Sequence, residues 1–171
     1  MKQLVFLDES GVSTDLTRLR GRALVGDRLV AQVPGGHWHT STIIAAVRLS
    51  GVFAPAIFDG PTDSDVFRAY VQQVLAKALD PGDVVVMDNL APHKASGIKE
   101  AIESVGASVL YLPPYSPDFN PIECLWSKVK QYLRSLAART FDALSDGLAA
   151  ALDTVTTSDC KGYFLNCGYA T

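Results

Sequence analysis

The sequence predicts a mixed α/β sheet that carries helices on both of its faces. Strand-like segments follow one another before Thr62, and from there onward strand-like and helix-like segments alternate. The connections between the later strands are long enough for parallel crossovers. The 171 residues contain no internal repeat, low-complexity segment or linker, so we expect one domain over residues 1–171.

The first expected strand covers residues 4–7, which are apolar on both faces of any strand. This pattern is typical of a central strand, and the acid Asp8 ends it. Residues 12–27 are polar and contain Gly and Arg, which favours a loop or a loose hairpin arm. Three further strands are expected as an antiparallel meander, at residues 28–33, 40–49 and 53–60.

A helix is expected from Thr62, where the apolar residues take up helical spacing. Thr62 and Asp65 fit a capping box at its start, and Pro81 with Gly82 marks its end. The expected buried face consists of Val66, Phe67, Tyr70, Val71, Val74, Leu75 and Ala78.

The second half continues the alternation. Residues 83–89 are again apolar on both faces and contain a second strand-end acid, Asp88, which predicts another central strand. A helix over about residues 94–105 and a strand over 108–112 follow. The tail from residue 160 favours no particular element.

A long helix is expected to open at Asn120 and Pro121, directly after the proline-rich segment LPPYSPDFNP. Prolines restrict the freedom of this segment and therefore fix the direction in which the helix starts. A final helix is expected over about residues 140–155. The buried face of the long helix is expected to hold Ile122, Leu125, Trp126, Val129, Leu133 and Leu136.

Composition excludes several classes of protein. Hydrophobic residues make up 48% and charged residues 19%, which is not the balance of a disordered chain. No apolar run approaches the roughly 20 residues of a membrane span, and no secretory leader is recognisable, so we expect a soluble intracellular protein without membrane partners. The three cysteines form no C-x-x-C pair, which favours reduced thiols over a disulfide framework or a zinc site.

The formal net charge of −3 argues against a self-sufficient nucleic-acid binder. Such proteins are usually basic, because their affinity comes largely from cations placed at phosphates. If the chain acts on nucleic acid, we expect other segments or subunits to supply much of the binding.

Two acids, Asp8 and Asp88, each end a buried strand, and ligands of open α/β sheets bind at the carboxyl ends of strands. If the two strands are parallel neighbours, these acids converge. Carboxylates held about 4–5 Å apart repel by several kcal/mol at an effective dielectric near 20, so a proton or a cation must compensate them. Mg²⁺ or Mn²⁺ suits oxygen ligands, and Glu123 is the natural third ligand.

Each of these acids also has a simpler interpretation. Asn120 and Glu123 fit an N-x-x-E capping box, which requires no chemistry. Asp8 or Asp88 taken singly fits a turn residue at a strand end. The matching pair of strand-end acids and the rigid proline-rich segment favour the metal site.

Other polar residues also allow a structural and a functional interpretation. Glu9 would point away from Asp8 if the strand persists, as a salt-bridge partner or a substitute ligand. His37 and His39 flank a tryptophan in a Gly-rich loop but have no third metal ligand nearby. His93 fits either a structural histidine or a residue that orients Asp88 or contacts a phosphate. Asp118 fits a turn acid better than a catalytic one.

Three segments together resemble the catalytic domain of the mariner superfamily of DDE transposases, most closely its bacterial insertion-sequence branch. They are FLDESG, VVVMDNLAPHK and LPPYSPDFNPIECLWSKVK, and the likeness extends over nearly the whole chain. The 34 residues that lie between Asp88 and Glu123 resemble the gap between the second and third acids of many members.

The resemblance implies an RNase H-like fold, with a mixed five-stranded sheet of three antiparallel strands followed by parallel strands. It assigns Asp8, Asp88 and Glu123 as the acids that bind two Mg²⁺ or Mn²⁺ ions. It also implies metal-dependent DNA strand cleavage and strand transfer in cut-and-paste transposition.

Further residues are expected around these acids. Asn89, Asn120 and His93 would orient the carboxylates. We expect Lys94, Tyr115, Lys128 and Lys130 to face DNA, although the lysines fit a solvated helix surface equally well.

The expected partners are the transposon ends and the target DNA, bound by a homodimer in synapsis. Such transposases usually carry an N-terminal helix-turn-helix region, whereas the first expected strand here begins within five residues of Met1. We therefore expect a separate or frameshift-joined DNA-binding segment, or a truncated remnant, in the cytoplasm of a bacterium at the nucleoid.

Two alternatives remain open from the sequence. A catalytically silent transposase fragment would act as a binding or regulatory subunit. A phospho-receiver domain would share the strand VVVMDN but would alternate strand and helix from its start.

Overall fold

The computed structural model describes residues 3–170 and contains a five-stranded mixed sheet with strand order β3-β2-β1-β4-β5. The antiparallel pairs are β1 with β2 and β2 with β3, whereas β4 runs parallel to both β1 and β5. The strands are β1 (Leu4–Ser13), β2 (Thr40–Arg48), β3 (Gly51–Asp59), β4 (Val84–Met87) and β5 (Ser108–Tyr111). This arrangement confirms the predicted mixed sheet and rules out the receiver alternative.

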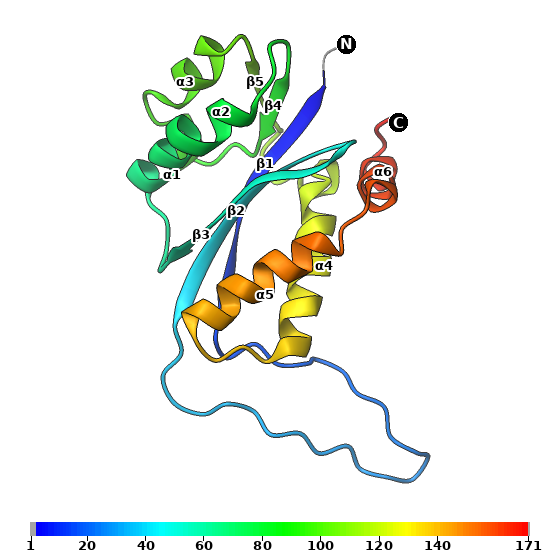
Figure 1. Ribbon diagram of the computed structural model, residues 1–171. Coiled ribbons are helices and arrows are strands. Elements are labelled where there is room, and N and C mark those ends of the chain that lie inside the picture. The colour runs from blue at the N-terminus through cyan, green and yellow to red at the C-terminus, as the bar shows by residue number, and fades with distance from the viewer. Residues whose placement is uncertain (1–2, 171) are drawn as a thin grey trace.

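Helices cover both faces of the sheet (Figure 1). One face carries α1 (Ser64–Tyr70), η1 (Val71–Leu75), α2 (Ala76–Ala78), η2 (Pro92–Lys94) and α3 (Ile98–Ser104). The other face carries α4 (Ile122–Leu136), α5 (Phe141–Asp153) and α6 (Thr157–Asn166), and the short helix η3 (Pro117–Phe119) precedes α4.

Successive side chains of β1 belong to two separate hydrophobic cores. Val5 and Leu7 are fully buried against α1 to α3, whereas Phe6 is fully buried against α4 to α6. Because successive side chains of a strand point to opposite faces, a central strand that is apolar throughout supports a helical layer on each side. Trp126, 2% exposed, is the largest buried side chain of the α4 side.

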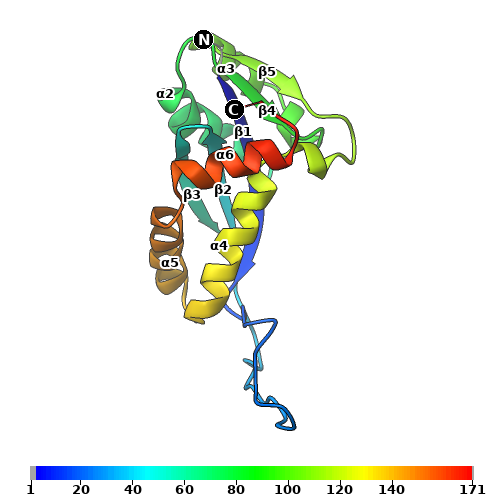
Figure 2. The ribbon, with the colours of Figure 1, turned by 90° about the vertical axis from the view of Figure 1, so that its right-hand side faces the viewer.

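The predicted strand at 28–33 is wrong. Residues 14–39 form an extended excursion between β1 and β2 that leaves the body of the molecule (Figure 2). Its base is closed by a hydrogen bond from Thr14 N–H to the carbonyl of His39, 3.0 Å long. Val30 is 80% exposed and Val33 71%, so the apolar side chains of this segment have no sheet to cover. The third antiparallel strand is β1 itself, which continues past Asp8 to Ser13.

The helix predicted from Thr62 starts two residues later. Asp63, not Thr62, caps α1, because its carboxylate accepts hydrogen bonds of 2.9 Å from the N–H groups of Asp65 and Val66. The helix continues as the π-helical segment η1 before α2, and Val74 is 37% exposed rather than buried.

The later helices also depart from the prediction in detail. The helix expected over 94–105 divides into η2 and α3, because Gly97 precedes α3 with a φ of 89°, in the left-handed region. Leu136 at the end of α4 is 47% exposed, not part of the buried face. Thr140 caps α5 as the prediction for 140–155 requires, whereas α6 had no predicted counterpart.

Within residues 3–170, no helix has the length and apolar character needed to cross a membrane.

Candidate active site

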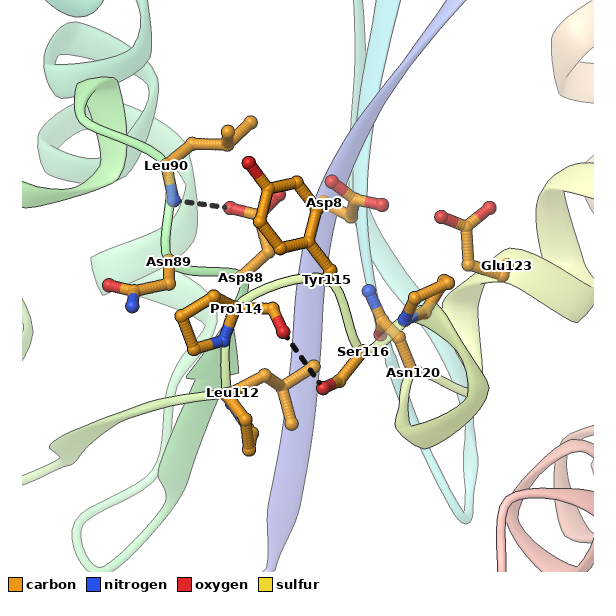
Figure 3. A pocket seen from close by; sticks show the side chains of 12 residues that line it. Asp8, Asp88, Asn89, Leu90, Leu112, Pro114, Tyr115, Ser116, Asn120 and Glu123 are labelled. Atoms are coloured by element: carbon orange, nitrogen blue, oxygen red, sulfur yellow. Dashed lines mark hydrogen bonds between the residues drawn. The ribbon is translucent and has the colours of Figure 1, made fainter.

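One cavity gathers the three acids that the sequence singles out. It has a volume of about 310 Å³, and Asp8, Asp88 and Glu123 line it together with Asn89, Tyr115 and Asn120. Figure 3 shows the three acids approaching from β1, from the end of β4 and from the start of α4. The structure therefore brings together residues that are up to 115 positions apart in the sequence.

Strand register places the two aspartates. Phe6 lies opposite Val86 in the parallel pair of β1 and β4, so two residues further along the strands Asp8 and Asp88 are at corresponding positions. β4 ends at Met87, which frees Asp88 for the loop, whereas Asp8 stays within β1. The expectation that both acids end their strands is thus correct for Asp88 and wrong for Asp8.

Glu123 lies in the first turn of α4, but the predicted capping box does not form. Its N–H donates to the backbone carbonyl of Asn120 at 3.1 Å, and the side chain of Asn120 makes no capping hydrogen bond. The Asn120 Oδ1 atom is buried and has no hydrogen-bond partner within the described residues. Capping therefore does not account for Asn120 and Glu123, and both side chains line the cavity instead.

Burial and mutual repulsion act on Asp8, which is 8% exposed. The pKa of this carboxyl is raised to about 7, chiefly by burial; the hydrogen bond from the N–H of Glu9 lowers it, and the neighbouring Glu123, Asp88 and Glu9 raise it. That hydrogen bond is 2.8 Å long. Asp8 is therefore the carboxylate whose charge most requires a compensating cation.

The donor set of the cavity fits a hard divalent cation. Three carboxylates and the orphaned Asn120 Oδ1 are all oxygen ligands, the kind that Mg²⁺ and Mn²⁺ prefer. Between residues 3 and 170, no three His, Cys, Asp or Glu side chains already stand close enough to hold a metal ion. The three acids thus share a cavity, and their role as metal ligands stays a prediction.

His93 joins two of the acidic residues from the opposite face of β1. Its ring is 1% exposed, its Nε2 contacts Glu9 Oε2, and its Nδ1 lies 2.5 Å from Asp88 Oδ1. Burial opposes protonation, yet contacts with Asp88 and Glu9 raise the pKa of His93 to about 10. The same contact with His93 lowers the pKa of Asp88 against the effect of burial. The structure therefore places Glu9 as a partner of His93, on the face away from Asp8.

The four residues expected to face DNA have different surroundings. Tyr115 is fully exposed at the cavity, with a φ of 56°. The ammonium group of Lys94 lies over the Tyr111 ring, 5.5 Å from its centroid. Lys128 donates to Asp159 Oδ2 and to the carbonyl of Thr154, both at 2.8 Å, so it joins α4 to α6.

Lys130 lies on the cavity side of α4. Burial lowers the pKa of its ammonium group, whereas the nearby carboxylates of Glu123 and Asp8 raise it and Arg134 lowers it. Of the lysines on α4, Lys130 rather than Lys128 is thus within the electrostatic reach of the acids.

The remaining candidates do not line the cavity of the three acids. His37 and His39 are exposed in the excursion, and Asp118 belongs to η3. Asp118 lines a neighbouring cavity that also includes Asn120 and Glu123.

Comparison with known proteins identifies the family. Residues 3–145 match the family described as DDE superfamily endonuclease. The transposase of the transposable element Tcb2 of Caenorhabditis briggsae is 33% identical over an alignment of 116 residues that covers 58% of this chain and 41% of that protein. The chain therefore spans less than half the length of this relative.

Solved structures of the Mos1 mariner transposase share the fold. A pre-cleavage Mos1 transpososome matches 96% of this chain and 52% of its own chain, with a TM-score of 0.73 and 14% identity. The Mos1 catalytic domain matches 96% of this chain and 75% of its own, with a TM-score of 0.64 and 15% identity. These matches confirm the predicted RNase H-like fold.

The family match covers most of the chain, and the fold and the relatives agree with it. The chain belongs to the DDE superfamily endonucleases and has the fold of a mariner-type transposase catalytic domain.

Proposed function

We propose that this chain is the catalytic part of a transposase and performs metal-dependent cleavage and transfer of DNA strands. The observation that supports the proposal is the cavity shared by Asp8, Asp88 and Glu123 in a chain of the DDE family. The relatives whose structures share its fold include a Mos1 complex with a transposon end and complexes with Mn and with Mg.

Asp8, Asp88 and Glu123 would hold two divalent ions, Mg²⁺ or Mn²⁺. Ions bound in this way lower the pKa of an attacking water or DNA 3′-hydroxyl and stabilise the leaving 3′-oxygen. The oxygen-only donor set and the raised pKa of Asp8 both support a cation at this cavity. No side chain is required to form a covalent intermediate with DNA.

The surrounding residues would position these acids. His93 holds one oxygen of Asp88 from behind, which limits the rotation of its carboxylate. Asn120 presents an unpaired Oδ1 to the same cavity, and Asn89 lines it beside Asp88. Tyr115, exposed at the cavity, is available to stack on a nucleotide.

The proposed substrates are transposon ends and target DNA, with two copies of the chain acting together in synapsis. Because the net charge is −3, we propose that a helix-turn-helix segment supplies recognition of the ends. The proposed setting is the nucleoid of a bacterial cytoplasm.

The decisive experiment combines the chain with its DNA-binding segment and DNA that carries the terminal inverted repeat. We expect strand nicking that depends on Mn²⁺ or Mg²⁺, that Asp88→Ala abolishes and that Asp118→Ala preserves, since Asp118 belongs to the same proline-rich region without lining the acid cavity. Absence of metal-dependent nicking, with association between subunits retained, would instead support a silent regulatory subunit.

A further inference from the structure

A second cavity lies between α4 and the excursion of residues 14–39. Its volume is about 620 Å³, the largest of the cavities described here, and its lining contains no acid. Three guanidinium groups, a carboxamide and two hydroxyls surround it. The polar lining residues are Arg18, Arg20, Ser127, Gln131, Arg134 and Ser135.

The three arginines of this cavity are free to take a ligand. Between residues 3 and 170, no hydrogen bond or ion pair engages the guanidinium of Arg18, Arg20 or Arg134. By contrast, Arg139 nearby donates to the carbonyls of Thr14 and Leu16, so its role is structural. Unpaired guanidinium groups around one hollow form a binding surface for phosphate oxygens.

This arginine cavity connects to the acid cavity through shared lining residues. The acid cavity shares Pro117, Asn120 and Glu123 with an intermediate cavity of about 350 Å³, and the intermediate cavity shares Ser127 with the arginine cavity. Positions 123, 127, 131 and 134 recur at the helical spacing that places side chains on one face. A single polar path therefore follows α4 from the acids to the arginines.

The length of this path along α4 can be expressed as a number of nucleotides of DNA. Arg134 lies eleven positions after Glu123, and at a rise of about 1.5 Å per residue this is about 16 Å of helix. Successive phosphates of one strand are about 3.4 Å apart along the axis of duplex DNA, and the strand also winds around that axis, so the path reaches about five nucleotides at most.

We propose that the DNA strand cut at the acid cavity continues along α4 and that Arg18, Arg20 and Arg134 bind its phosphates within about five nucleotides of the scissile phosphate. The inference rests on the proposed function, and it explains how a chain with a net charge of −3 contacts DNA close to its acids. The contacts reach phosphates only, so they add affinity without reading sequence.

The first test measures duplex binding to the full chain in EDTA by fluorescence anisotropy, over a series of salt concentrations. We expect the triple variant Arg18→Gln, Arg20→Gln, Arg134→Gln to lose at least about tenfold in affinity for any sequence. We also expect the slope of log K against log salt to fall by about three, one for each lost phosphate contact. Arg22→Gln is the matched control, because Arg22 is an exposed arginine of the same excursion that does not line the cavity.

The second test locates the path on the DNA. A photo-crosslinker attached at Arg134→Cys, in the complex with the DNA-binding segment and a transposon end, is expected to react within about five nucleotides of the cleaved phosphate. A crosslink more than about ten nucleotides away would overturn the proposed path.

The outcomes separate this inference from the proposed function. If the triple variant binds DNA like the wild type, or if the wild type binds no duplex even at low salt, the arginine cavity is not a DNA site, whatever the nicking assay shows. If the variant loses self-association instead of DNA binding, the cavity is a contact between copies and the DNA assignment is wrong. If DNA binding depends on the arginines but metal-dependent nicking is absent, the inference stands and the proposed catalytic function is wrong.

Discussion

The imidazole of His93 lies against the carboxylate of Asp88, with Nδ1 2.5 Å from Oδ1. Glu9 occupies the other ring nitrogen, and the Phe67 ring packs on the imidazole with centroids 4.5 Å apart. Tyr111 fixes the backbone here by donating from its hydroxyl to the carbonyl of His93 at 3.1 Å. A buried charged ring thus connects β1 with the segment that follows β4, directly behind the acid cavity.

His93→Gln is expected to destabilise the protein by about 2 kcal/mol at pH 7, because it leaves two carboxylates without a cationic partner. Urea denaturation measures the change. The double variant Glu9→Gln, His93→Gln serves as the control and should recover part of the loss. A change below about 0.5 kcal/mol would show that the contact contributes little to stability.

The same histidine predicts a dependence of stability on pH. Its pKa in the folded state is raised to about 10 from an ordinary value of 6.5, so its stabilising contribution is complete below about pH 6.5 and disappears as the pH rises through 10. Thermal melts between pH 6 and 10 should therefore show a decline in wild type that is much weaker in His93→Gln. Parallel declines in both proteins would contradict the assignment of the charge to His93.

Asp8→Asn is expected to stabilise the metal-free protein. The pKa of Asp8 is raised from 3.8 to about 7, so ionisation of this carboxyl costs stability as the pH rises from about 4 through 7, by at most about 4 kcal/mol. In EDTA at pH 8, Asp8→Asn should therefore melt several degrees above wild type, and the difference should vanish near pH 4. If Asp8→Asn melts below wild type at pH 8, the protein itself stabilises the negative charge of Asp8 without a metal.

Glu123→Gln removes the charge of the third acid but keeps a side chain of similar size in the first turn of α4, so it tests whether this carboxylate binds metal. Binding of Mn²⁺ to the folded protein alone raises its melting temperature. We expect this shift to be several degrees in wild type, to be strongly reduced in Glu123→Gln and to be unchanged in Asp118→Asn, an acid of the adjacent η3. An equal Mn²⁺ response in wild type and Glu123→Gln would remove Glu123 from the metal site.

The sequence predicts the core of the fold well where a segment is apolar on both faces. The runs before Asp8 and Asp88 became the neighbouring strands β1 and β4, and their parallel register brings the two acids to one edge. The segment at 28–33 also has a strand-like pattern but is exposed, because such a pattern becomes a strand only where a partner strand lies beside it. No local pattern reveals that β1 continues to Ser13 and pairs there with Thr40.

The surroundings of the site were harder to predict than its acids. The N-x-x-E spacing favoured a cap, but Asn120 turns its side chain into the cavity, which the pattern cannot show. The arginine cavity was missed because Arg18 reaches it through the excursion, although the spacing of Ser127, Gln131 and Arg134 after Glu123 already marked one face of α4. The partner of Lys128 lies 31 positions away, at Asp159, beyond any local signal.

The two lysines of α4 are expected to separate structure from DNA contact. Lys128 forms an ion pair with Asp159 and donates to the Thr154 carbonyl, so Lys128→Ala should lower stability slightly with little effect on DNA binding. Lys130 lies near Glu123, Asp8 and Arg134, so Lys130→Ala should weaken DNA binding and leave stability nearly unchanged. Urea denaturation and duplex-binding titrations of both variants make the comparison. If Lys128→Ala weakens DNA binding more than Lys130→Ala does, the DNA crosses the α6 side of α4 and the path past Ser127 is wrong.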